Sequence, residues 1–119
     1  MDELVRRLVA TVGIDSAVAE KSVGIILQFL QKEGPADKVQ ALLDQLPGSQ
    51  AALQAARDGG GGFSVGGVMG AGTQLMGLGL SMGQVQSVTR EVISYAREKI
   101  GEDAVGEIVG AIPGLGQFV

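Results

Sequence analysis

Four acidic side chains occur within residues 98–107, and such carboxylates can bind a hard cation or exchange protons. They are Glu98, Glu102, Asp103 and Glu107. Their spacing differs from that of a calcium-binding EF-hand loop. Asp103 also falls where a helix N-terminus would favour a negative charge. We therefore interpret the group as a solvated acidic face and expect no metal site.

Other side chains that commonly carry catalysis are scarce. The chain has no His and no Cys, which excludes thiol nucleophiles, disulfides, imidazole bases and zinc sites with His or Cys ligands. Tyr95, beside Ser94 and near Arg97, is a conceivable proton-transfer group, but its helical spacing favours core packing with an exposed hydroxyl. No Ser or Lys has an evident activating base beside it. We expect no enzyme activity and no cofactor.

The segment GGGGFSVGG, from Gly59 to Gly67, resembles a phosphate-binding loop only in its glycine content. Phosphate loops also need a Lys and a Ser or Thr at fixed spacing after the glycines. Neither follows at that spacing, and no charged residue occurs from Gly59 to Thr89. The composition therefore predicts a flexible linker.

The overall charge argues against nucleic acid as a partner. Thirteen acidic residues outnumber nine scattered basic ones, and the net charge is −4. A nucleic-acid backbone is bound by clustered Lys and Arg. The N-terminal sequence starts with acidic residues instead of the positive charges of a secretory signal, which favours a cytoplasmic location. The apolar residues 66–80 are too few to span a membrane and include Thr73 and Gln74.

Apolar residues recur at helical spacing along the chain and predict an all-α fold with an aliphatic core, since only three Phe, one Tyr and no Trp are present. In the first part of the chain we expect helices over residues 4–12, about 15–33, 39–46 and 49–57. Gly13, Gly34-Pro35 and Pro47-Gly48 provide the breaks between them. Asp15 or Ser16 can cap the second of these helices through a side-chain oxygen.

The apolar stripes of these helices identify the expected core. The second helix supplies Ala19, Ser22, Val23, Ile26, Leu27, Phe29 and Leu30, the third Val39, Leu42, Leu43 and Leu46, and the later long helix Val85, Val88, Val92 and Tyr95. Before that later helix, Ser81 and Gln84 fit a capping box, with Leu80 and Val85 placed for a hydrophobic staple.

The two parts of the chain repeat one pattern at an offset of 66 residues. Pro47-Gly48 then falls on Pro113-Gly114, Gly13 on Gly79, and Phe29 on Tyr95. The order of glycine stop, cap, long helix, break, short helix and Pro-Gly is the same in both, and self-similarity of this kind indicates a duplicated unit.

We therefore expect one compact domain over residues 1–119, built from two copies of a three-helix unit. Repeat unit one covers residues 2–48, the short helix and Gly-rich linker cover 49–67, repeat unit two covers 68–114, and an apolar tail covers 115–119.

Several segments of the chain resemble a known family. They are GIILQFLQKE, KVQALLDQLPGSQAAL, LMGLGLS and VISYAREKIGEDAVGEIVGAIPG, and the most telling are Leu46-Pro47-Gly48 and Gly79-Leu80-Ser81. Over residues 4–113 the chain resembles the VcgC/VcgE-type bacterial domain of unknown function. This resemblance implies a bacterial, two-unit helical domain and carries no activity or catalytic residues.

The charge-free second part predicts an interaction surface. A free surface helix normally has a charged face, and this segment has none, so we expect more than one side of it to be covered. The candidate residues are Val68, Met69, Leu75, Met76, Leu78, Leu80 and Phe118. We expect a non-catalytic interaction or scaffold module that forms a homodimer. The alternative is a carrier of an apolar ligand or a peripheral lipid-binding protein, with the methionines lining an adaptable pocket.

Overall fold

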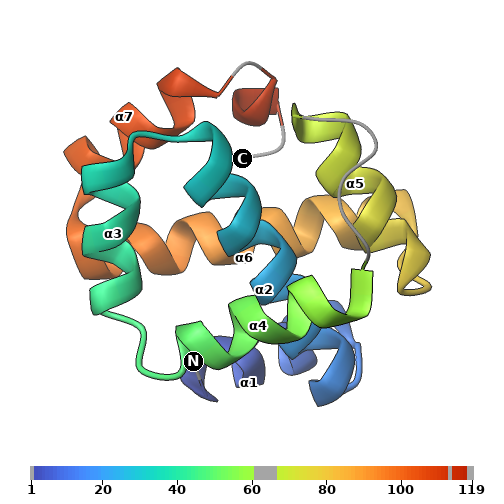
Figure 1. Cartoon of the computed structure of the whole chain (residues 1–119). Helices are drawn as coiled ribbons and strands as arrows, with labels where there is room; N and C mark the ends of the chain where they lie inside the picture. The colour runs from blue at the N-terminus through green and yellow to red at the C-terminus, as the bar shows by residue number, and fades with distance from the viewer. Residues whose placement is uncertain (1, 61–66, 113, 118–119) are drawn as a thin grey trace.

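The computed structural model describes residues 2–60, 67–112 and 114–117, and within these ranges the chain forms seven α-helices, one short 3-10 helix and no strand (Figure 1). The helices are α1 (Asp2–Val12), α2 (Ser16–Glu33), α3 (Ala36–Asp44), α4 (Ser49–Gly60), α5 (Gly67–Gly77), α6 (Met82–Ile100) and α7 (Glu102–Ala111), followed by the 3-10 helix η1 (Leu115–Gln117). The prediction of an all-α fold is confirmed. The Cα atoms form a rounded body of 32 × 30 × 25 Å.

The two longest helices, α2 and α6, occupy the middle of the molecule. Helix α2 contacts α1, α3, α4, α5 and α6, and α6 contacts α1, α3, α5 and α7 as well as α2. Residues 22–27 of α2 are buried on every side of the helix. A helix that is apolar all round belongs in a core. The hydrophobic members of the stripes predicted for α2, α3 and α6 all belong to one buried cluster in the described part of the chain.

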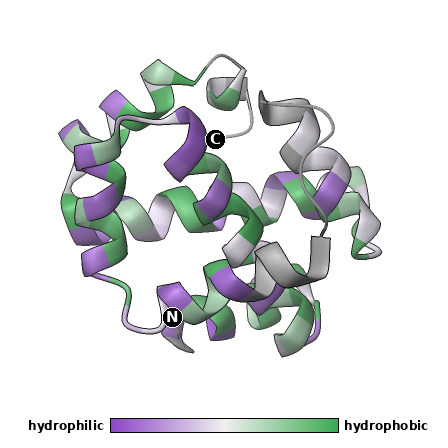
Figure 2. Cartoon of the chain, viewed as in Figure 1, coloured by the Kyte–Doolittle hydropathy of each residue, from purple (hydrophilic) through white to green (hydrophobic). Residues whose placement is uncertain are grey.

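The outer helices bury one side only. In Figure 2, hydrophilic and hydrophobic residues alternate along α3 and α7, as expected of amphipathic helices at a surface. Val39, Leu42 and Leu43 are the buried residues of α3, and Val105 and Ile108 are those of α7. Among the described residues, no helix is both long enough and apolar enough to cross a membrane.

The two N-terminal caps that the sequence predicts have different outcomes. Ser81 caps α6 as expected: its hydroxyl accepts from the Gln84 backbone N–H at 3.2 Å, and the Gln84 side chain accepts from the Ser81 N–H at 2.9 Å. Asp15 occupies the N-cap position of α2, but its side chain accepts no capping hydrogen bond, so that part of the prediction is wrong. Only its carbonyl joins the helix, by accepting from the Ala19 N–H at 2.8 Å.

Glycines end α1 and α5 as predicted. Gly13 has a φ of 80° and Gly79 a φ of 96°. In this left-handed region a side chain would be strained, which explains why glycine follows both helices. The chain turns at each of these positions, and α1 and α5 contact the long helices that follow them.

The described ends of the glycine-rich segment are helical, although its composition predicts a linker. Gly59 and Gly60 belong to α4, and Gly67 begins α5, so these three residues of the predicted linker are helical. Residues 61–66 lie outside the described residues. Glycine costs about 1 kcal/mol relative to Ala inside a helix. The contact of α4 with α2 along the core provides tertiary packing that can offset this cost.

Candidate interaction surface

The predicted interaction residues separate into buried and exposed groups. Leu75 and Leu80 are only 1% and 6% exposed and belong to the core. Leu78 is partly buried and packs against the same core. Val68 and Met69 lie in α5, but their side chains are outside what the structure describes, and Phe118 lies outside the described residues.

Two methionines at the connection between α5 and α6 face solvent. Met76 is 46% exposed near the end of α5, and Met82 is 55% exposed at the first residue of α6. With Val9 of α1, at 39%, they are the large hydrophobic residues that are exposed in the described part of the chain. We call Met76 and Met82, with Leu78 between them, the methionine surface.

The backbone around the methionine surface is held by defined hydrogen bonds. The Leu78 N–H donates to the Leu75 carbonyl and the Gly79 N–H to the Met76 carbonyl, both at 3.0 Å, and these bonds close the last turn of α5. The capping box of Ser81 then holds the first turn of α6. Because the backbone is fixed at both helix ends, the flexible thioether side chains project from backbone positions that are well defined.

The acidic face predicted over residues 98–107 is exposed, and two of its members form ion pairs with the first part of the chain. Arg7 of α1 meets Glu98 of α6 through two contacts, of 2.7 and 2.9 Å. Lys38 of α3 meets Glu107 of α7 at 3.3 Å. Within the described residues, no three acidic side chains converge to hold a metal ion.

The ion pair between Arg7 and Glu98 shifts the titration of both groups. The hydrogen bond from the Arg7 guanidinium, with a smaller contribution from its charge, lowers the pKa of the Glu98 carboxyl below its ordinary value. The same hydrogen bond raises the pKa of Arg7. Sequence reasoning missed this pair because its members are 91 residues apart and no local pattern connects them.

Tyr95 lies in the core beside this ion pair. Its side chain is 4% exposed, and the Arg7 guanidinium lies 5.3 Å and the Lys99 ammonium 5.2 Å from the centre of its ring. Both distances are within the range of a cation–π interaction. The prediction that Tyr95 packs in the core is confirmed. Its environment is that of a packing residue, with two cations on its ring.

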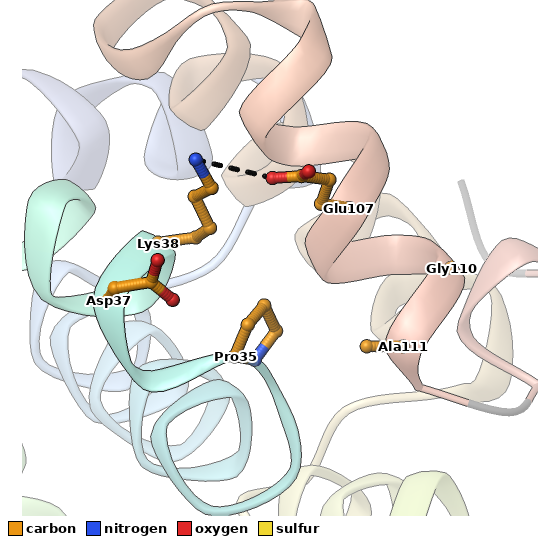
Figure 3. Close-up of a pocket in the computed structure, with 6 residues that line it drawn as sticks. All are labelled: Pro35, Asp37, Lys38, Glu107, Gly110 and Ala111. Atoms are coloured by element: carbon orange, nitrogen blue, oxygen red, sulfur yellow. Dashed lines mark ion pairs between the residues drawn. The ribbon is translucent and has the colours of Figure 1, made fainter.

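A pocket of about 500 Å³ lies between the start of α3 and the end of α7. Its lining residues are Pro35, Asp37, Lys38, Glu107, Gly110 and Ala111. Figure 3 shows the Lys38 side chain extended across to Glu107, with Asp37 on the same side of the cleft as Lys38. The charged residues of this lining are half-buried or exposed, and Lys38 is already paired, so the arrangement is that of an open cleft between two surface helices.

No protein-family model, no curated protein and no solved structure matches the chain.

Proposed function

We propose that the protein is a non-catalytic interaction module that forms a homodimer through the methionine surface. The observation that carries the proposal is the exposure of Met76 and Met82 within a stretch, Gly59 to Thr89, that contains no charged residue. Contiguous exposed hydrophobic residues are typical of surfaces that a partner covers, and the proposal takes Met76 and Met82 to form part of such a surface. The unbranched methionine side chain adapts readily to a second surface.

A second copy of the chain is the partner that this surface fits best. A twofold contact brings the same residues together from both copies, so it needs no complementary charge. The absence of charged side chains from the segment removes the repulsion that a self-contact would otherwise meet. The small residues Gly77, Gly79 and Gly83 surround the methionines and are exposed, so another backbone can approach closely.

Sedimentation velocity at micromolar concentrations tests this proposal. The double substitution Met76→Lys and Met82→Lys puts two positive charges at the contact and is expected to convert a dimer to a monomer. Val9→Lys is the matched control, because Val9 is also an exposed hydrophobic residue but lies on α1. In protein that has never been unfolded, a wild type that is monomeric at every concentration, or a dimer that survives the double substitution, would refute the proposal.

A second candidate is contact with an apolar ligand or a lipid surface, and the same exposed methionines favour it. Native mass spectrometry of protein purified from cells separates the two candidates. A co-purifying lipid or acyl compound supports the second candidate, and it should be lost in the same double methionine variant. A protein mass without any bound compound weakens the second candidate.

We also propose that the fold is a duplicated three-helix unit, as the offset of 66 residues predicts. At that offset Ser16 coincides with Met82, the first residue of α6, and Ala36 coincides with Glu102, the first residue of α7. The positive φ angles also recur, at Gly13 and Gly79 and again at Gly48 and Gly114. This two-unit organisation is what the resemblance to the VcgC/VcgE-type bacterial domain implies. We propose that the chain belongs to that family.

A further inference from the structure

The ion pairs described above all join one part of the chain to the other. We call α1–α4 the first half and α5–η1 the second half. Arg7 and Lys38 belong to the first half, whereas their partners, Glu98 and Glu107, belong to the second. The contact of the Arg7 guanidinium with the Tyr95 ring also crosses between the halves. These three contacts therefore all lie at the interface between the halves.

The helix packing also joins the two halves. Helix α1 packs on α6 of the second half, and α5 packs on α2 of the first half. The pairs α2·α6 and α3·α7 also join the halves. The buried residues of both halves form one cluster, so each half completes the core of the other. Leu4 and Leu8 of α1 are fully buried in this arrangement.

From this reciprocal packing we propose that the interface between the halves is also an interface between two copies of the chain. In the exchanged dimer, the first half of each copy packs on the second half of the other copy. Every contact between halves is then kept, so the exchange costs no contact energy. Exchange of identical elements is a low-cost route to a dimer for this reason. The partner is a second copy of this chain.

The exchanged dimer differs from the dimer proposed through the methionine surface. Exchange requires the two halves to separate, which exposes the core, so it is slow in the folded protein and fast when unfolded chains refold at high concentration. It leaves Met76 and Met82 exposed. The double methionine substitution therefore does not affect it, and each of the two proposals can fail without the other.

Cross-linking between singly substituted full-length chains tests the exchange. The natural chain has no Cys, so Arg7→Cys in one preparation and Glu98→Cys in another give unique reactive positions. The two preparations are unfolded together, refolded at high concentration and treated with a short bismaleimide. An exchanged dimer places position 7 of one copy beside position 98 of the other, and a cross-linked dimer is expected. Each preparation refolded alone should give much less of it.

A second pair of variants, Lys38→Cys and Glu107→Cys, repeats the experiment at the other ion pair and guards against a folding defect in the first. Linked dimers that form only in the mixed samples, at both pairs, support the exchange. Mixed samples that stay unlinked while circular dichroism shows native helix content would overturn it. Equal linking in the separate preparations would also overturn it, because that result reports ordinary surface contact.

Discussion

Individual residues show how the protein uses its few charges. Arg7 contacts a carboxylate and an aromatic ring at once, and Lys99 approaches the same ring. Exposed ion pairs of this kind contribute little stability. The pair of Arg7 with Glu98 matters more for geometry than for stability. Its bidentate contact favours one position of α1 along α6. Both cations lie over the ring of Tyr95, which is the one tyrosine in the sequence.

The pH dependence of stability follows from the lowered pKa of Glu98. A carboxyl whose pKa is lower in the folded than in the unfolded state contributes stability above its unfolded pKa and loses it as the pH falls through the folded value. Glu98→Gln is therefore expected to destabilise the protein at neutral pH and to make no difference at strongly acid pH. Urea unfolding at a series of pH values measures this.

Glu20→Gln, at another exposed glutamate, is the control for the loss of a negative charge. The expectation fails if the difference between wild type and Glu98→Gln is the same at pH 7 and at pH 3.

At the scale of single helices, the sequence patterns at the helix ends differ in how well they predict the structure. The capping box at Ser81 and the glycines after α1 and α5 are short patterns whose physical function needs only nearby residues, and all are found as predicted. Asp15 has a suitable side chain in the N-cap position, yet it makes no capping bond. The residue type therefore predicts where the helix starts but does not establish the hydrogen bond.

Removing the two cap side chains should have unequal effects. Ser81→Ala deletes a capping bond and is expected to cost about 1 kcal/mol of stability. Asp15→Ala deletes no capping bond and is expected to cost clearly less. Chemical denaturation of the two variants, which share the same substituted residue, gives the comparison. Equal losses would mean that Asp15 caps α2 in solution.

On the scale of the whole molecule, the sequence predicts the elements better than their arrangement. Periodicity and breaks predict the helices and most of the core, including Val39, Leu42 and Tyr95. They contain no information about which helix faces which, so they do not predict the packing of α1 on α6 or the pair of Arg7 with Glu98. For the same reason, periodicity could not separate the buried Leu75 from the exposed Met76 in the candidate surface.

Because the halves complete one core, they should assemble even when the chain between them is missing. Residues 1–60 and 67–119 produced together as two chains are expected to co-purify in equal amounts with the helix content of the intact protein. Leu8→Asp in the first chain should prevent this, since Leu8 is fully buried on a helix that contacts α6. The neighbouring exposed change, Val9→Asp, should not. Failure of the unsubstituted pair to associate would show that the connection is essential.

The position of Tyr95 also makes its intrinsic fluorescence sensitive to the contact between the halves. With no Trp in the chain, the near-ultraviolet fluorescence comes mainly from this one phenol. The ring belongs to α6 and lies in the core of the protein. The Arg7 guanidinium of the first half is 5.3 Å from its centre. Movement of α1 away from α6 changes the surroundings of the ring, and with them the intensity of its emission. Separation of the halves can therefore be followed in real time by stopped-flow fluorescence, without attaching a dye.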